Sequence, residues 1–595
     1  MYDYQAPLRD MQFILSTIAG LDEVASLPNC EEASADLVSA VLEEAGKFAA
    51  GVLAPLNQVG DLQGCRLEDG VVHTPEGWQQ AYDQFRDAGW VGLALPQEYG
   101  GQGLPKLVST PVWEMWFSTN MAFAMLPQLN VGQAEALQIA ASEEQKQIWL
   151  HKVVSGEWGS TMNLTEPQAG SDLAATRTKA VPQADGTYKL FGQKIFISYG
   201  EHELTPNIVH LVLARLPDAP AGVKGLSLFI VPKYLLDAEG NPSTRNDVRC
   251  ISIEHKMGIH GSPTCTLSYG DEGGAMGYLV GEANRGLETM FIMMNEARFG
   301  VGVQGVGLAE RAYQYALNYA RTRVQGRNAI TGETGQPIIC HPDVQRAILS
   351  MRARVMAMRS LLYTAASWFD LAHHHPEQSI ADKYRRYVDL LMPVAKGWCT
   401  EVGNEVCDDA IQIFGGMGFV EETGIAQYFR DARIITIYEG TTGIQANDLI
   451  GRKILREKGA TLYELIAEMQ HTQQALTQSN ELNNLAGNFQ EILVSLQKAS
   501  DWMLAQDKHH QVQVLAAATP FLYLLGTVCG AWQLARLALA AEAQKTALSI
   551  DTVYSQNLIE LTQFYFHTFG VQAVAYAATV NNAGNSLARF DFGHA

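Results

Sequence analysis

The sequence predicts a multidomain α+β protein that is mostly α-helical. Its 595 residues exceed what one hydrophobic core supports, so about three or four domains are expected. The apolar pattern also changes twice, from helical spacing to short β-branched runs and back again. We therefore expect an N-terminal helical domain at 1–158, a middle β domain at 159–282, a helical bundle at 283–455 and an extra helical domain at 456–595.

In the N-terminal part, apolar residues stand three and four positions apart over 32–54 and 131–154, which predicts helices. A segment rich in Gly, 96–105, is expected as a loop. The middle part contains short runs rich in β-branched and aromatic residues, bounded by Gly, Pro and Asp, which predict strands. These runs are 188–199, 208–216, 226–231 and 264–269.

Helical spacing returns near residue 286, and three long candidates follow at 287–323, 341–373 and 379–415. Long helices joined by short loops predict an antiparallel bundle. Residues 456–595 are expected to be helical again, with loops near 479–486 and 544–549.

Residues 511–535 carry no charge and are long enough to span a bilayer. Pro520, Gly526 and Gly530 interrupt this run, so we expect two shorter helical pieces that form a buried hairpin. Peripheral contact with a membrane is the alternative.

The composition, 47% hydrophobic and 18% charged, describes a soluble globular protein. Its net charge of −21 argues against nucleic acid or an anionic membrane as a general partner. The eight cysteines form no C-x-x-C pair, so reduced thiols are expected. The N-terminus shows no apolar run suited to secretion, and a cytoplasmic protein is expected.

Glu439 is the strongest single candidate for chemistry. It stands between an apolar, strand-like run at 434–437 and a turn rich in Gly and Thr. Poor solvation on the apolar side disfavours a charged carboxylate and raises its pKa, which suits a general base. A small neighbour, Gly440, would let a substrate approach the backbone. The alternative is a glutamate on a solvated face, where this residue type is usually found.

Two other patterns have simpler explanations. Residues 300–305 fit G-x-G-x-x-G, but a helical run precedes them and Arg-rich sequence follows, so close helix packing is expected instead of a dinucleotide site. His373, His374 and His375 stand together without a Cys or carboxylate at a ligand spacing. We expect a solvated segment there and no metal.

Several motifs occur in order along the chain. They are LPQEYGG at 95–101, TMNLTEPQAGSD at 161–172, GQKIFIS at 192–198, GEANRG at 281–286, QIFGGMGF at 412–419 and YEGT at 438–441. Together they closely resemble the acyl-CoA dehydrogenases over residues 35–455. The opening YQAPLRD at 4–10 and the long C-terminal extension resemble the larger bacterial branch of that family, which includes an enzyme acting on methylthiopropionyl-CoA.

The resemblance implies a β-barrel-like middle domain, a C-terminal domain of the four-helix-bundle type and one FAD per chain. The implied flavin and pyrophosphate residues are Met162, Leu164, Thr165, Gly170, Ser171, Phe196, Ile197, Ser198, Thr441 and Gly443. The residues implied to reach the adenosine half of FAD across a subunit contact are Arg323, Gln325, Gln412, Gly415 and Gly416.

This chain departs from many relatives at four of these places. Phe196 stands where many have Trp, and Ser198 where many have Thr. A Phe that often precedes the glycine at 326 is missing, which weakens the adenine assignment. Asn295 replaces an Asp, while Arg298 is retained. A structural role for Arg298, in an ion pair with a nearby carboxylate, is the alternative to substrate binding.

The implied reaction is α,β-dehydrogenation of an acyl-CoA to a 2,3-enoyl-CoA. Glu439 takes the α-proton, its amide helps to hold the thioester oxygen, and the β-hydrogen leaves as hydride to flavin N5. The residues implied to lie near the substrate are Ser171, Asn295, Arg298 and Gly440. Electron-transfer flavoprotein is the implied acceptor.

We expect a homodimer, because the extension could cover the helical face that shorter relatives bury in a tetramer. Three alternatives to the dehydrogenase stay open: an acyl-CoA oxidase, a non-catalytic scaffold relative, and a flavoenzyme acting on a small non-CoA substrate such as a nitroalkane. The sequence leaves the length and branching of the acyl chain open.

Overall fold

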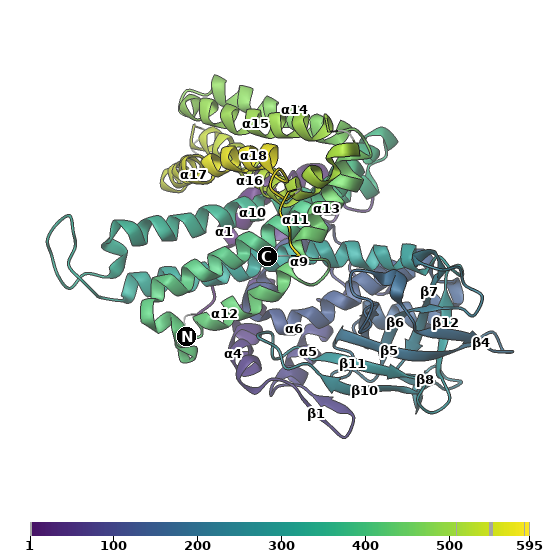
Figure 1. The fold of residues 1–595 in the computed structure, drawn as a ribbon. Coiled ribbons are helices and arrows are strands. Elements are labelled where there is room, and N and C mark those ends of the chain that lie inside the picture. The colour runs from purple at the N-terminus through teal and green to yellow at the C-terminus, as the bar shows by residue number, and fades with distance from the viewer. Residues whose placement is uncertain (1–2, 507, 547–550, 588, 594–595) are drawn as a thin grey trace. The chain divides into compact units, whose positions relative to one another are not determined.

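The computed structural model describes residues 3–506, 508–546, 551–587 and 589–593, drawn in Figure 1. Contacts divide the chain into two units. The helical unit comprises Met1–Gly46, Pro105–Ser118 and Val301–Ala595, and the β unit comprises Lys47–Leu104 and Thr119–Gly300. The predicted fold class, mostly helical with a β-barrel-like middle part, is confirmed.

The β unit contains a closed ring of strands. Strand β5 pairs with β12, β12 with β7, β7 with β6, and β4 pairs with both β6 and β5. The pairing of β4 with both neighbours closes this sheet into a barrel. Strands β11 and β10 extend it beyond β5, and β3 lies parallel to β6. The strands are β3 (Gly159–Asn163), β4 (Lys179–Pro182), β5 (Tyr188–Ser198), β6 (Ile208–Arg215), β7 (Leu226–Pro232), β10 (Val248–Ile253), β11 (Thr264–Tyr269) and β12 (Ala275–Val280).

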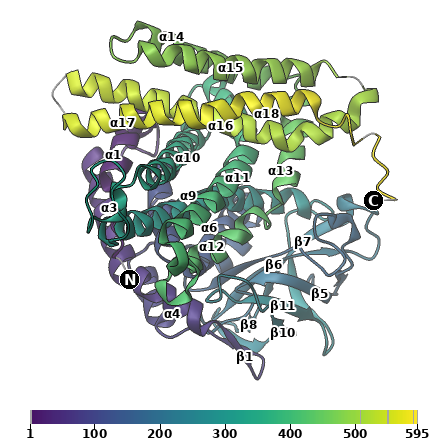
Figure 2. The same ribbon diagram turned by 60° about the vertical axis from the view of Figure 1, so that its left-hand side comes forward.

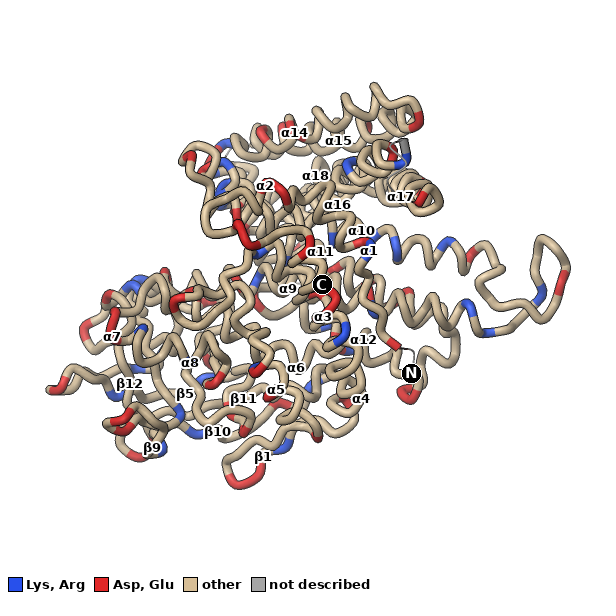
Figure 3. Tube along the Cα trace, turned by 180° about the vertical axis from the view of Figure 1, so that it is seen from behind, with Lys and Arg blue, Asp and Glu red and all other residues tan. Residues whose placement is uncertain are grey.

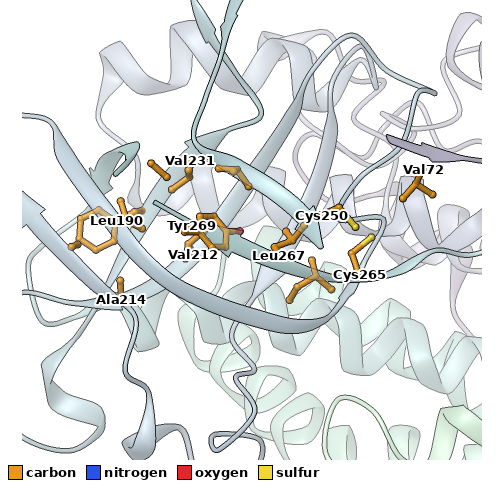
Figure 4. Packing of buried hydrophobic residues seen from close by; sticks show 14 residues of the cluster. Val72, Leu190, Val212, Ala214, Val231, Cys250, Cys265, Leu267 and Tyr269 are labelled. Carbon is orange, nitrogen blue, oxygen red and sulfur yellow. The ribbon is translucent and has the colours of Figure 1, made fainter. Parts of the chain in front are cut away.

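The four strands predicted from the sequence are β5, β6, β7 and β11. Their buried side chains fill the interior, where Leu190, Val212, Val231 and Tyr269 lie together (Figure 4). The prediction missed β10 and β12, which are as long as the predicted β11, the shorter β3 and β4, and the separate pair β8 (Tyr234–Leu236) and β9 (Pro242–Arg245). The strands of three to five residues, β3, β4, β8 and β9, carry too few residues for an alternating pattern to stand out.

Several helices of the β unit precede the barrel strands in the chain. They are α4 (Ala54–Gln63), α5 (Trp78–Asp87), the later part of α6 (Lys106–Ala140), α7 (Glu143–Gln145) and α8 (His151–Val154). The helix predicted over 131–154 is interrupted, because Ser142 and Gln145 form a capping box that starts a new helix. A hairpin of β1 (Arg66–Glu68) and β2 (Val71–His73) was not predicted, and Val72 of that hairpin belongs to the barrel core.

The helical unit contains the three long helices predicted from the sequence. They are α9 (Gly286–Thr322), which begins in the β unit, α10 (Pro342–His374) and α11 (Gln378–Phe414). The chain also supplies α1 (Leu8–Thr17), α2 (Leu21–Ala25), α3 (Ala35–Phe48), α12 (Ile425–Ala432) and α13 (Thr442–Asp448) to this unit. A Cβ added at Gly302 would lie 2.7 Å from the Ala395 carbonyl oxygen, and one at Gly305 would lie 2.6 Å from that of Cys399. The G-x-G-x-x-G string therefore allows close packing of α9 on α11, as predicted.

The apolar run at 434–437 is not a strand. Residues Arg433–Thr436 form a 3-10 turn that continues from α12. Four residues cannot distinguish a strand from a tight helical turn by their polarity, and here no strand of the described residues lies alongside to pair with them.

The C-terminal extension folds as α14 (Ala460–Gln478), α15 (Asn483–Leu504), α16 (Gln511–Thr546), α17 (Thr552–Tyr565) and α18 (Val571–Asn582). Figure 2 shows α15, α16 and α18 running side by side as a layer over α10 and α11, which α16 contacts. The predicted loop near 479–486 is shorter than expected, and the one near 544–549 falls largely on residues 547–550, outside the described residues.

The prediction of two helical pieces over 511–535 was wrong, because α16 continues through Pro520. Proline removes one backbone hydrogen bond, but Phe521, Leu522 and Leu525 are fully buried around it, and that packing maintains the helix. Among the described residues, Gln511–Lys545 is long and apolar enough to cross a membrane, with a mean hydropathy of 1.7. Since 72% of that apolar window is buried inside the protein, α16 is a core helix of the helical unit.

Candidate functional site

The end of β3 and the loop after it carry the first predicted flavin residues. Leu164 is buried, and Met162 and Thr165 are half-buried. Glu166 and Ala169 exchange backbone hydrogen bonds of 3.0 and 2.9 Å, which close a tight turn. Beyond it, Ser171 is exposed, and a Cβ at Gly170 would meet no heavy atom within 4 Å. A ligand can therefore approach the backbone of this segment.

A buried ion pair that the sequence reasoning did not select fastens this loop to β5. The Lys194 ammonium donates to the Glu166 carboxylate at 2.8 Å and to the Leu164 carbonyl at 3.0 Å. Thr178 donates its hydroxyl to the same carboxylate at 2.6 Å. Burial alone would raise the pKa of Glu166, but Lys194 and these hydrogen bonds lower it to about 2. Glu166 therefore remains charged at neutral pH.

Both members of the pair stand inside the quoted motifs, yet nothing in the sequence links two residues 28 positions apart. The backbone adds a second link, since the Ile195 N–H donates to the Thr165 carbonyl at 2.9 Å. The β unit thus brings the predicted residues of the β3 loop and those of β5 together.

Phe196 lies at a bulge in β5. The pairing with β11 shifts between Cys265 and Leu267, so Ile195 and Phe196 together oppose one residue of β11. Phe196 has a positive φ of 58°, which is uncommon for a residue with a Cβ. The bulge turns its ring outward, leaving 59% of this residue exposed, while Ile197 is buried and Ser198 is half-buried.

These features fit the isoalloxazine end of FAD. An exposed aromatic ring at a strained backbone position offers a face for a flat heterocycle. The neighbouring Thr165 and Ser198 hydroxyls can donate to ring atoms, and the open backbone at Gly170 can receive a phosphate group. Met162, Leu164, Thr165, Phe196 and Ser198 would hold the flavin, with Gly170 and Ser171 toward the pyrophosphate.

Glu439 lies in the helical unit, in the turn between α12 and α13. It is half-buried and has a positive φ of 55°, followed by Gly440 with φ 92°. Two successive residues with left-handed backbone conformation bend the chain sharply, and only the second is a glycine. The Thr441 hydroxyl then accepts from the Ile444 N–H and caps α13, leaving Thr441 and Gly443 exposed at its start.

Three residues outside the quoted motif, Lys396, Gln445 and Gln304, hold this turn, and the sequence analysis selected none of them. The Lys396 ammonium donates to the Gly440 carbonyl at 2.6 Å, and the Gln445 amide donates to the Glu439 carbonyl at 2.9 Å. The Tyr438 hydroxyl donates to the side-chain oxygen of Gln304 on α9. Burial raises the pKa of Tyr438, so its hydroxyl stays protonated. No local pattern marks these contacts, because the partners come from three different helices.

Asn295 and Arg298, predicted near the substrate, both lie on α9 in the β unit. They are three positions apart, so they share one side of the helix. Asn295 is exposed, whereas Arg298 is buried with its guanidinium 6.0 Å from the Phe291 ring.

The residues predicted to contact the adenosine half of FAD lie at the ends of α9 and α11. The Tyr319 and Phe414 rings stack at 4.1 Å, which brings these two helix ends together. All of the predicted residues there are exposed: Arg323, Gln325, Gln412, Gly415 and Gly416. They are therefore accessible to a second molecule or to a ligand.

His373 and His374 end α10, and the His375 ring accepts from the Glu377 N–H at 3.0 Å. Within the described residues, no group of three or more His, Cys, Asp or Glu side chains could hold a metal ion.

Four family models match successive segments of the chain. They are the acyl-CoA dehydrogenase N-terminal domain at 38–157, middle domain at 161–271 and C-terminal domain at 284–455, and the acetyl-CoA dehydrogenase C-terminal-like domain at 465–591. A solved acyl-CoA dehydrogenase from Bacillus anthracis, complexed with FAD, shares the fold with a TM-score of 0.74. It is 23% identical and aligns over 94% of this chain and 90% of its own.

Two relatives align over almost the whole chain. The 3-methylmercaptopropionyl-CoA dehydrogenase of Ruegeria pomeroyi is 46% identical over 98% of this chain and 99% of its own length. The broad-specificity linear acyl-CoA dehydrogenase FadE5 of Mycobacterium tuberculosis is 33% identical over 99% of each chain. Matches of this extent show that the chain belongs to the acyl-CoA dehydrogenase family and is an FAD-dependent enzyme.

Proposed function

We propose that this enzyme oxidises an acyl-CoA to the 2,3-enoyl-CoA, with Glu439 as the base that removes the α-proton. The observation that carries the proposal is the conformation of Glu439. It is a residue with a Cβ in the left-handed region, half-buried, in a turn held by hydrogen bonds to its own carbonyl and to the next one. Strained backbone persists where the surroundings determine it, and it concentrates at functional sites.

Glu439 would accept the proton released from the carbon next to the thioester, and its backbone N–H would donate to the thioester oxygen as negative charge develops there. Bound FAD supplies the two-electron acceptor that takes the β-hydrogen. In the β unit, Phe196 and the β3 loop would orient the flavin, and the Glu166–Lys194 pair would keep that loop against β5. On α9, Arg298 and Asn295 would lie toward the substrate.

The first substrate to test is 3-methylmercaptopropionyl-CoA, because the relative that acts on it is 46% identical over nearly the full length. Straight-chain acyl-CoAs come next, as FadE5 is named for them. We further propose electron-transfer flavoprotein as the electron acceptor. Anaerobic bleaching of the flavin by a panel of acyl-CoAs will rank the substrates, and hydrogen peroxide formation without electron-transfer flavoprotein would instead identify an oxidase.

Replacing Glu439 tests the base. Glu439→Gln keeps the shape of the side chain but removes the proton acceptor, so we expect normal FAD content and a fall in flavin reduction of at least ~100-fold. Glu422→Gln, at an exposed glutamate upstream on the same chain segment, is the matched control and should reduce its flavin at the wild-type rate. Rapid reduction of the Glu439→Gln enzyme would refute the assignment.

A further inference from the structure

Lys396 is a charged side chain in a fully buried place. It lies on α11 and is 0% exposed. Burying an ammonium group is unfavourable unless strong acceptors replace water. Its ammonium donates to the Gly440 carbonyl at 2.6 Å, a short, charge-assisted bond to the residue that follows Glu439.

The turn that receives this bond has an unfavourable backbone. Glu439 and Gly440 both have positive φ, at 55° and 92°. Their two carbonyls, which are consecutive, each accept from a buried side chain: Gln445 donates to the first at 2.9 Å and Lys396 to the second at 2.6 Å. Each bond fixes the direction of one peptide plane, and these two planes flank the Cα of Gly440. The plane held by Gln445 also adjoins the Cα of Glu439, so fixing both planes restricts the turn on the side that directly follows the base.

The C-terminal extension keeps Lys396 in place. A Cβ added at Gly397 would lie 2.6 Å from Leu522 of α16, and one added at Gly526 of α16 would lie 2.2 Å from the Trp398 ring. Helix α16 also packs against α13, which begins just after the turn. The two elements that hold the turn, α11 and α13, therefore rest on the same extension helix.

We propose that Lys396 is a positioning residue for the base, acting through the Gly440 carbonyl and supported by α16 of the extension. The proposal rests on the proposed role of Glu439. In this arrangement the buried cation keeps the Glu439 side chain in the orientation that meets the α-carbon of the substrate, and a small loss of alignment slows the proton transfer.

Lys396→Met removes the charge and the hydrogen bond while retaining most of the volume. In stopped-flow reduction by acyl-CoA, we expect a rate ~10- to 100-fold below wild type, with KM changed by less than about twofold and FAD content per chain unchanged. With substrate deuterated at the α-carbon, the isotope effect on reduction should increase, because proton removal becomes slower than the other steps. Lys383→Met is the matched control, since Lys383 lies on the same helix and instead pairs with Glu468 of the extension at 2.8 Å.

Gln445→Met serves as a second variant that carries no change of charge. Its rate of flavin reduction should also fall, but by less than in Lys396→Met. If Lys396→Met fails to fold, the rate in Gln445→Met tests the positioning of the turn. A wild-type rate and isotope effect in folded Lys396→Met, or in Gln445→Met when the first variant does not fold, would overturn the positioning role. Retained activity in Glu439→Gln would instead show that the base assignment itself is wrong.

Discussion

The hydrogen-bond partners of a single side chain can determine its protonation state. His260 is an example from the β unit, where it joins the segment before β11 to α4. Its Nδ1 lies 3.0 Å from an Asp61 carboxylate oxygen, and its Nε2 lies 2.8 Å from the Lys256 carbonyl. Both partners only accept, so both ring nitrogens must carry hydrogen and the ring is an imidazolium. The Asp61 carboxylate, and then the backbone carbonyls of Asp61 and Lys256, raise the pKa of His260 to about 9 despite its partial burial.

The raised pKa predicts how stability varies with pH. A histidine whose pKa is about 6.5 in the unfolded chain and about 9 in the folded one stabilises the protein fully below pH 6.5. That contribution, on the order of 3 kcal/mol, is lost as pH rises from 6.5 to 9. The unfolding temperature of the wild-type protein should therefore fall as pH rises over this range.

The variant His260→Gln should lack this component, which a comparison of unfolding temperatures at pH 6.5 and 9 will detect. His73→Gln, which removes a half-buried histidine paired with Glu203 at 2.7 Å, should keep the wild-type dependence. Equal pH dependence in wild type and His260→Gln would contradict the imidazolium assignment.

At the scale of elements, glycines determine how closely the long helices approach. Gly305 of α9 and Gly403 of α11 each present a bare Cα to the partner helix, so that a Cβ at Gly403 would lie 2.8 Å from the Gly305 carbonyl. Backbone cannot move aside as the end of a flexible side chain can. The spacing of the two helices, and with it the placement of Lys396 on α11 relative to α9, therefore depends on the absence of side chains here.

Gly305→Ala should force α9 and α11 apart and destabilise the helical unit by ~1–3 kcal/mol, the usual effect of overpacking. Gly487→Ala in α15 is the matched control, because no heavy atom lies within 4 Å of a Cβ there. It should be neutral or stabilising by up to ~1 kcal/mol, as alanine favours helix over glycine. Denaturant unfolding of both variants compares them directly, and equal stability would contradict the packing argument.

At the scale of the whole molecule, the distribution of charged and exposed apolar side chains bears on which partners the protein binds. Acidic and basic residues are spread over helices and loops of the chain (Figure 3), and the net charge is −21. In the helical unit, large apolar side chains are exposed beside the residues predicted to reach the FAD of another subunit: Val324, Ile330, Met417 and Phe419, the last with 92% exposure. We propose that these side chains are buried in a homodimer, because exposed apolar groups gather at subunit contacts.

Arg323→Ala tests this assembly. If Arg323 reaches the adenosine half of FAD across the subunit contact, the variant should lose FAD on dialysis while its affinity for acyl-CoA changes little. Arg346→Ala, which removes an exposed arginine paired with Asp343 at 2.9 Å, should retain its cofactor. Light scattering should give twice the chain mass of 65.2 kDa for wild type, and a monomer or a tetramer would contradict the dimer.

The sequence by itself determined the elements with long periodic patterns. Helices α9, α10 and α11 and strands β5, β6, β7 and β11 lie where apolar spacing placed them, because that spacing reports which face of an element is buried. The ordered motifs also identified the family before any contact was known. The four domain boundaries and the roles of the site residues stay predictions.

Only the tertiary structure decided how the site is held. The Glu166–Lys194 pair, the Lys396 bond to Gly440 and the bulge at Phe196 join residues on different elements, and no local pattern reports which partners meet. Two predictions from local sequence were wrong because of packing. Helix α16 continues through Pro520 instead of breaking there, and the run before Glu439 forms a 3-10 turn instead of a strand. The physical reason is the same in each case. A local pattern states what one segment can form, whereas the free energy of burying it against its neighbours decides which form it takes.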